Sequence, residues 1–139
     1  MPLRKNAKVE LLKRVPLFAG CSKAELGELA ASTDELALPE GRVLAREGRS
    51  GREFFVLIDG TVCVSRGGRT LTELGAGDWF GEIALVTGAP RTATVTATSP
   101  VDVLVLDERA FRRVVQEMPS LALKVMASLG QRLAADARS

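Results

Sequence analysis

Residues 79–97 read Trp79-Phe-Gly-Glu-Ile-Ala-Leu-Val-Thr-Gly-Ala-Pro-Arg-Thr-Ala-Thr-Val-Thr-Ala97 and carry the clearest chemical pattern in this 139-residue chain. A turn rich in glycine and aspartate precedes the stretch. Within it, the pattern predicts a short helical turn over residues 82–86 and an alternating strand over residues 93–97. Gly81 lacks a Cβ atom, so an anion can approach the backbone closely where the helical turn begins. The stretch therefore predicts an anion site between a turn and a strand.

The backbone and the side chains of this stretch supply complementary groups. The N–H groups of Glu82, Ile83 and Ala84 are the unpaired donors of a helix N-terminus, where a phosphate is favoured. Arg91 can hold a phosphate through two parallel charge-assisted hydrogen bonds, and the hydroxyl of Thr92 follows it. The Glu82 carboxylate can only accept hydrogen bonds, so it favours a sugar hydroxyl. An anion site, a cation and a hydroxyl acceptor together indicate a cyclic ribose phosphate.

The segments Phe80-Gly-Glu-Ile-Ala-Leu85 and Pro90-Arg-Thr-Ala-Thr-Val95 resemble the phosphate-binding cassette of the cyclic nucleotide-binding domain. The resemblance extends from about Pro16 to the end of the chain. It implies that Glu82 binds the ribose 2′-hydroxyl and that Arg91 binds the cyclic phosphate. The ligand-binding residues that it implies are Gly81, Glu82, Ile83, Ala84, Arg91 and Thr92.

The remaining sequence between residues 34 and 107 predicts an antiparallel β-sandwich or jelly roll, because short alternating segments are separated by glycine and proline turns. Asp59-Gly60 is typical of a hairpin and predicts that the strands on either side of it pair. The polar, glycine-rich segment 46–52 is interpreted as an ordinary connector. The predicted strands span residues 35–38, 42–45, 53–58, 61–65, 70–74, 93–97 and 101–106. The resemblance implies a mainly β fold with flanking helices: an eight-stranded antiparallel jelly-roll barrel with a short cassette helix inside it.

Helices are predicted on both sides of the roll. Residues 8–15 form the first, a capping box at Ser22 starts the second, and Asp107 caps a third over residues 108–117. A last helix begins near Pro119, with an apolar stripe of Leu121, Val125, Leu129 and Leu133 and with Met126 beside it. Simple packing against the roll explains this stripe, whereas the resemblance implies that the helix also closes over the bound base as a lid.

We expect a single cyclic nucleotide-binding domain over residues 1–139. Its N-terminal helices occupy residues 1–33 and its β-roll residues 34–107, with the cassette at residues 80–93. The C-terminal helices occupy residues 108–139. This length is enough for one substantial hydrophobic core.

Composition excludes several classes of protein. Hydrophobic residues make up 46% and charged residues 26% of the chain, which is typical of a globular protein. No apolar run approaches the ~20 residues of a membrane-spanning helix, and the N-terminus does not resemble a secretory signal. We therefore expect a cytoplasmic protein that meets no membrane through this chain alone. The net charge of +2 gives no case for a nucleic-acid partner.

The absence of histidine is equally informative. It excludes histidine-based zinc, haem and non-haem iron sites and histidine general-base catalysis. The two isolated cysteines, Cys21 and Cys63, form no metal or redox motif. We expect no catalytic residues, no metal and no cofactor.

The sequence therefore favours a non-catalytic sensor of a 3′,5′-cyclic mononucleotide, and the family resemblance, not the residues, favours cAMP over cGMP. Such a sensor would signal through movement of the last helix to an effector protein or a fused effector domain. The alternative is a degenerate jelly-roll interaction module that binds no nucleotide, in which Glu82 and Arg91 simply pair with each other. A phosphodiesterase is disfavoured because that hydrolysis normally needs metals or a strong base. A DNA-binding regulator needs a helix-turn-helix after the last helix, and these residues contain none.

Overall fold

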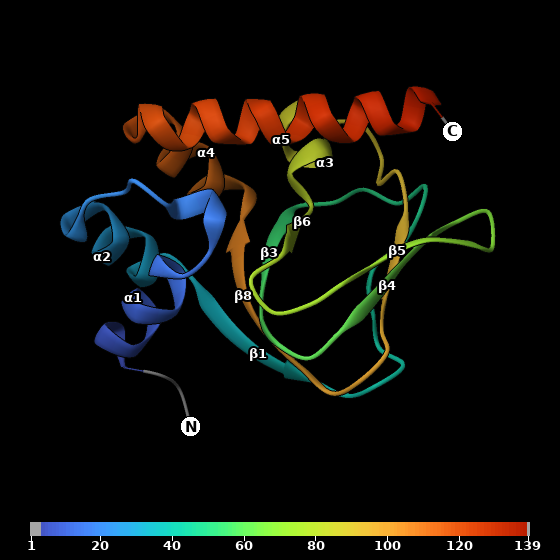
Figure 1. Cartoon of the computed structure of the whole chain (residues 1–139), viewed down its shortest axis with the longest axis horizontal. Coiled ribbons are helices and arrows are strands. Elements are labelled where there is room, and N and C mark those ends of the chain that lie inside the picture. Colours follow the sequence, from blue (N-terminus) through green and yellow to red (C-terminus); the bar gives the residue numbers. More distant parts are fainter. Residues whose placement is uncertain (1–3, 139) are drawn as a thin grey trace.

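The computed structural model describes residues 4–138, except for the side chains of Lys5, Glu82, Ile83, Val86, Leu133 and residues 135–138. Within that part of the chain, eight strands form two four-stranded antiparallel sheets with helices beside and above them (Figure 1). The first sheet contains β1 (Asp34–Leu38), β8 (Val101–Asp107), β3 (Glu53–Asp59) and β6 (Trp79–Phe80), in that order. The second contains β2 (Val43–Ala45), β7 (Thr94–Ala97), β4 (Val62–Arg66) and β5 (Arg69–Leu74).

The helices frame this sandwich. They are α1 (Lys5–Lys13), the 3₁₀ turn η1 (Pro16–Phe18), α2 (Lys23–Ala31), α3 (Glu82–Thr87), α4 (Glu108–Glu117) and α5 (Pro119–Arg138). The predicted mainly β jelly roll with flanking helices is confirmed. No ladder joins the two sheets among the described strands, so the roll is an open sandwich and not a closed barrel. The helix α3 lies at one end of the roll, between β3 and α5, and is not enclosed by strands (Figure 1).

The predicted hairpin at Asp59-Gly60 is wrong. β3 pairs with β8 and β6, whereas β4 pairs with β5 and β7, so the chain passes from one sheet to the other at this turn. Residues 54–57 are all buried, as expected for a central strand that is covered on both faces. Gly60 has φ +91°, and a Cβ atom there would overlap the carbonyl oxygen of Pro100. The Asp-Gly pair thus makes a tight crossing between sheets instead of a two-stranded ribbon.

The predicted helix caps are confirmed by hydrogen bonds. Ser22 Oγ accepts from the backbone N–H of Glu25 over 3.1 Å, and the Glu25 carboxylate accepts from the Ser22 N–H over 2.7 Å. Asp107 likewise accepts from a backbone N–H in the first turn of α4. The first helix differs from its predicted span of residues 8–15, because α1 begins earlier and ends before Val15. Val15 precedes Pro16 and has ψ 123°, the extended conformation that proline favours in its predecessor.

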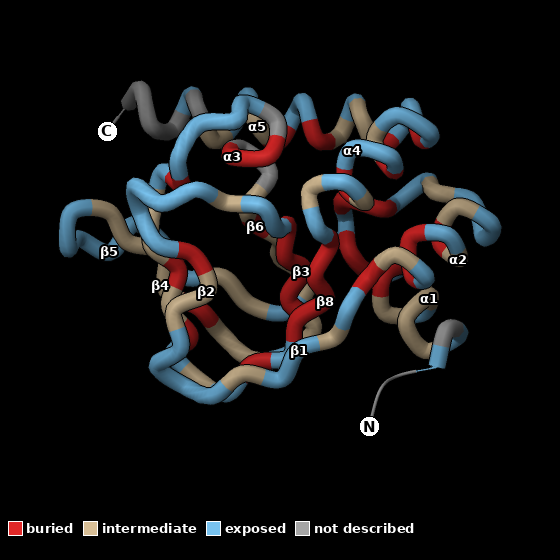
Figure 2. Tube along the Cα trace, turned by 180° about the vertical axis from the view of Figure 1, so that it is seen from behind, coloured by how far each residue is buried: buried red, intermediate tan, exposed pale blue. Residues whose placement is uncertain are grey.

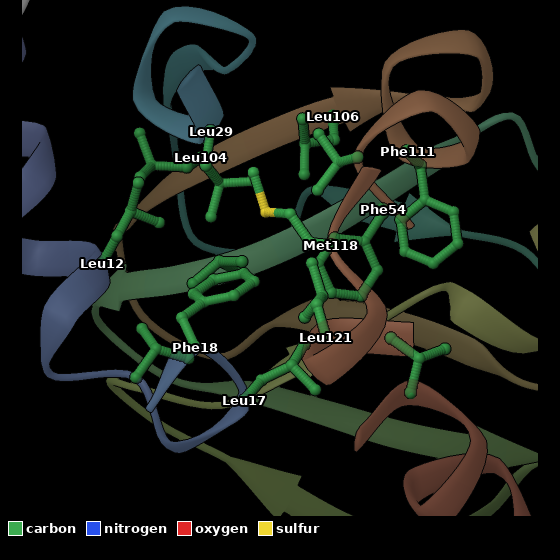
Figure 3. Packing of buried hydrophobic residues seen from close by; sticks show 14 of the residues in the cluster. Leu12, Leu17, Phe18, Leu29, Phe54, Leu104, Leu106, Phe111, Met118 and Leu121 are labelled. Atoms are coloured by element: carbon green, nitrogen blue, oxygen red, sulfur yellow. The ribbon is translucent and has the colours of Figure 1, made fainter. Parts of the chain in front are cut away.

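Two hydrophobic clusters lie on the two faces of the first sheet. Phe54 and Leu104 point toward the helices, whereas Phe55 and Val103 point toward the second sheet, because neighbouring strand residues face opposite sides. Figure 2 shows β3 and β8 as the buried centre of the molecule. Figure 3 shows the helical cluster, which includes Leu12, Leu17, Phe18, Leu29, Phe54, Leu104, Leu106, Phe111, Met118 and Leu121.

The helix α5 lies across the end of the roll and covers α3 and α4 (Figure 1). Of its predicted apolar stripe, Leu121 and Val125 are buried and Leu129 is half-buried. The side chain of Leu133 lies outside the described residues. Met126, which was predicted beside the stripe, is 63% exposed and lies on the outer surface of α5. No described helix combines the length and the apolar character that crossing a bilayer requires.

Candidate functional site

The short strand β6 brings the cassette against the first residues of β3. Phe80 is paired with Phe55, and their rings stack with centroids 4.7 Å apart. Gly81 follows with φ +105°, a conformation that favours glycine. A Cβ atom on Gly81 would lie only 2.6 Å from the carbonyl oxygen of Glu53. Gly81 is therefore required both for the turn and for the close approach of the two backbones.

The predicted cassette helix is present as α3 and is bounded by glycines at both ends. Gly81 is its N-cap and Gly88, with φ 72°, its C-cap. The backbone N–H groups of Glu82, Ile83 and Ala84 thus belong to the first turn, as the sequence predicts. The Ala84 side chain is buried. The side chains of Glu82 and Ile83 lie outside the described residues, and so do the predicted roles of the Glu82 carboxylate, including its pairing with Arg91.

Arg91 joins the cassette to the start of β3. Its side chain is almost fully buried, since only 8% of the residue is exposed. Nη1 donates to the carbonyl oxygen of Gly81 over 3.2 Å, and Nη2 donates to that of Glu53 over 2.8 Å. Buried charge is costly unless it is hydrogen-bonded, so these carbonyls hold the guanidinium in a defined place.

The segment 46–52, interpreted from the sequence as an ordinary connector, is the loop between β2 and β3, and its backbone is hydrogen-bonded to that of Arg91. The N–H of Arg91 donates to the carbonyl oxygen of Arg49 over 2.8 Å, and the carbonyl oxygen of Arg91 accepts from the N–H of Gly48 over 2.9 Å. This reciprocal pair fixes the backbone from which the Arg91 side chain projects. The sequence did not predict this contact, because the partner of the loop lies some forty residues further along the chain.

A cavity of about 300 Å³ opens between the cassette and the second sheet. This volume is at the lower end of the range of ~300–1,000 Å³ that is typical of small-molecule sites. Part of its wall is apolar: Ala45, Val64, Leu71, Leu74, Phe80, Ala84, Ala93 and Val95. The polar side chains on its wall are Arg66, Thr72, Arg91, Thr92 and Arg132. Gly81, Ala84, Arg91 and Thr92 of the predicted site therefore meet at one cavity.

Two arginines at this cavity were missed by the sequence analysis. Arg66 donates from Nε to the carbonyl oxygen of Thr92 over 2.7 Å, which links β4 to the residue after Arg91. Arg132 reaches the cavity from α5 and donates from Nη2 to the carbonyl oxygen of Trp79 over 2.6 Å. Trp79 itself packs against the helical cluster and is not among the residues that line the cavity.

A second hollow, of about 710 Å³, lies between α1 and the edge of the first sheet. It is larger, but its wall contains none of the predicted site residues and is formed instead by residues such as Lys8, Leu36 and Asp102. Among the described residues, no three metal-ligating side chains come together at either place. The smaller cavity is therefore the candidate site.

Residues 35–118 match the family model described as the cyclic nucleotide-binding domain. The chain belongs to the cyclic nucleotide-binding domain family, as the resemblance of its cassette implied. This is a family of regulatory ligand-binding domains and not a catalytic family.

Relatives and solved structures agree with this placement. A cyclic nucleotide-gated potassium channel of Rhizobium etli is 36% identical over 113 residues, which are 81% of this chain and 32% of the relative. The regulatory domain of Toxoplasma gondii PKA, solved with cAMP, superposes with a TM-score of 0.82 at 25% identity, covering 95% of this chain and 50% of that one. The catabolite activator protein of Thermus thermophilus superposes with a TM-score of 0.80 at 27% identity, covering 88% of this chain and 61% of that one. The chain spans about a third of the length of the channel relatives that it matches.

Proposed function

We propose that this chain is a non-catalytic sensor that binds a 3′,5′-cyclic mononucleotide in the cavity between the cassette and the second sheet, and that it prefers cAMP to cGMP. Family membership supports the ligand class. The preference for cAMP is supported by the Toxoplasma gondii domain, which was solved with that nucleotide.

The observation that carries this proposal is the place of Arg91. Its guanidinium is nearly buried, is held by two backbone carbonyls and forms part of a cavity wall next to the first turn of α3. A fixed guanidinium in such a place is suited to a phosphate. Arg91 would bind the cyclic phosphate and Glu82 the ribose 2′-hydroxyl. The other proposed contacts are the backbone groups of Gly81, Ile83 and Ala84 and the hydroxyl of Thr92.

The base would occupy the apolar part of the cavity, between Val64, Leu74 and Val95. Arg132 contributes to the same wall from α5, so a ligand at the cassette would be covered by this helix. Binding would shift the population toward the form in which α5 is held against the roll. An effector protein, or a fused effector domain, would read that shift.

We also propose that the N-terminal helices, the roll and the C-terminal helices act as one ligand-binding unit over residues 1–139. The helical cluster supports this proposal because it joins α1, α2, α4 and α5 to β3 and β8 through buried side chains. Among the described side chains, those of both sets of helices share one buried cluster with the sheet.

Calorimetric titration with cAMP, cGMP and 5′-AMP tests which nucleotide the protein binds. We expect saturable binding at one site, tightest for cAMP and weakest for 5′-AMP, whose phosphate is not part of a ring. Chromatography of the recovered cAMP should show no opened product. An absence of heat and of any melting-temperature shift with either cyclic nucleotide would replace this proposal by that of a protein-interaction module.

Hydrogen exchange of the backbone amides over residues 119–137 tests whether ligand binding holds α5 against the roll. We expect stronger protection in this segment when cAMP saturates the site, because the bound ligand would hold α5 against the cavity. Protection that is equal with and without nucleotide would remove the helix from the mechanism while leaving the binding site in place.

A further inference from the structure

Within the segment 46–52, Gly51 lies directly against the Arg91 side chain. A Cβ atom at Gly51 would overlap Nε and Cζ of Arg91 and would lie 2.7 Å from its Cδ. The three nearest atoms to this position all belong to Arg91. The arginine side chain therefore crosses the backbone of Gly51 through space that any other residue would fill.

The backbone of Gly51 does not itself require glycine. Gly51 is absent from the glycines with positive φ, which include Gly48 in the same segment and Gly81 in the cassette. An alanine could adopt the local conformation without the strain that it would meet at those two positions. The missing side chain at Gly51 therefore serves the packing of Arg91 and not the path of the main chain.

We propose that Gly51 is a positioning residue for the anion site and that it acts by leaving room for the Arg91 side chain; this inference rests on the proposed function. The guanidinium donates to the carbonyl oxygens of Glu53 and Gly81, and the Arg91 side chain lies against the bare backbone of Gly51. Glu53 lies only two residues after Gly51, so one short segment provides both the space and an acceptor. The Arg91 backbone is fixed by the same segment.

Substitution of Gly51 by alanine should displace the Arg91 side chain without destabilising the fold. The atoms in the way belong to a flexible side chain, so Arg91 can move aside while the main chain keeps its path. That movement breaks the alignment of Nη1 and Nη2 with their carbonyl acceptors and takes the guanidinium away from the proposed phosphate. We expect Gly51→Ala to unfold with nearly the parent midpoint but to bind cAMP about tenfold more weakly.

The control variant is Gly75→Ala. Gly75 also lies outside the positive-φ group, and a Cβ atom there would meet nothing within 4 Å. We expect its affinity and its unfolding midpoint to equal those of the parent. A general effect of replacing glycine by alanine in a loop would appear in this variant as well.

A double-mutant cycle with Arg91→Ala shows whether Gly51 acts through the arginine. Calorimetry would give the cAMP affinity of the parent, of Gly51→Ala, of Arg91→Ala and of the double variant. We expect Gly51→Ala to lower the affinity of the parent but to have no effect when residue 91 is already alanine. Parent-like binding of Gly51→Ala, or an equal fold-loss in both backgrounds, overturns the inference.

A measurement without ligand keeps this inference separate from the proposed function. In ¹H–¹⁵N spectra the Arg91 Nε–H resonance is identified as the one missing from Arg91→Ala. We expect its exchange with water to be slow in the parent and in Gly75→Ala, and faster in Gly51→Ala. If the parent bound no cyclic nucleotide the proposed function would fail, yet this comparison would still decide the role of Gly51: unchanged exchange overturns it.

Discussion

Trp79 and Ser128 are joined by a hydrogen bond in which the indole Nε1 donates to the serine Oγ over 3.3 Å. The carbonyl oxygen of the same tryptophan accepts from Arg132, one turn further along α5. Trp79 lies two residues before Gly81, so the strand that leads into the cassette is attached to two successive turns of the last helix. This is a direct physical connection between the proposed ligand site and the proposed moving element.

Removal of the Ser128 hydroxyl should loosen this connection. We expect Ser128→Ala to lower the unfolding free energy by about 0.5–1.5 kcal/mol, as the loss of one ordinary hydrogen bond does. It should also speed amide exchange along α5. Ser120→Ala is the matched control, because Ser120 is an exposed serine in the first turn of the same helix. Equal exchange rates in the two variants would contradict a role for the Trp79–Ser128 bond in holding α5.

Replacement of Arg91 should affect binding far more than folding. Loss of one charge-assisted contact costs about 1.5–3 kcal/mol, so Arg91→Ala should bind cAMP roughly ten- to a hundredfold more weakly. Arg112→Ala is the control, because the side chain of that arginine is 58% exposed and forms an ion pair with Glu108 along the surface of α4. Titration calorimetry measures both. An unchanged affinity for Arg91→Ala would show that the phosphate binds elsewhere.

Gly81 and Gly88, the two caps of α3, should differ in their tolerance of alanine. Both have positive φ, but a Cβ atom on Gly81 would also lie 2.6 Å from the Glu53 carbonyl oxygen, whereas one on Gly88 would meet nothing within 4 Å. We expect Gly88→Ala to cost about 1–2 kcal/mol through backbone strain alone, and Gly81→Ala to cost more. Urea unfolding of the two variants makes the comparison, and a reversed order would argue against this backbone approach.

Two methionines provide a test of the helical cluster. Met118 is 1% exposed inside that cluster, whereas Met126 is 63% exposed on the outer side of α5. Met118→Ala should lower the unfolding free energy by about 2–5 kcal/mol, because it leaves a cavity among well-packed side chains. Met126→Ala should change it by no more than about 0.5 kcal/mol. Comparable losses in the two variants would mean that α5 is packed on a different face.

The Cys21 thiol should ionise at higher pH in the folded protein than in the unfolded one. Burial is the main reason that its pKa is raised, the Glu25 carboxylate raises it further, and Lys124 acts in the opposite direction. Alkylation of a Cys63→Ser variant with iodoacetamide, followed against pH with and without urea, should give the higher midpoint in the folded protein. Folding raises the pKa of this thiol, so its protonation contributes to the free energy of unfolding. That contribution is fully present below the pKa of the thiol in the unfolded chain, and it is lost as the pH rises through the pKa in the folded protein. Coincident midpoints would contradict this assignment.

Local patterns were enough to predict most of the secondary structure. The Ser22 capping box, the cap at Asp107 and the alternating strands depend on neighbouring residues, and all of them are present. The strand β6 was missed because two residues, Trp79 and Phe80, are too short to show a period. The hairpin failed for a different reason: Asp59-Gly60 specifies a tight turn but not which strands lie beside it.

Within the candidate site, the residues predicted from the cassette were those that lie near one another in the sequence. Gly81, Ala84, Arg91 and Thr92 do meet at one cavity. Arg66 and Arg132 were missed because they reach it from β4 and α5, and no local pattern tells where a strand or helix crosses another. The role of Gly51 is equally non-local, since it depends on a side chain that belongs to residue 91.

The strand β3 is shared by both hydrophobic clusters, since its alternate residues enter one or the other. Loss of β3 would expose both clusters together, so we expect the chain to melt in a single cooperative transition. A ligand bound between the sheets would then raise the melting temperature of the whole molecule by mass action. No described residue of α1 or α2 lines the cavity, yet these helices would become harder to unfold when it is filled.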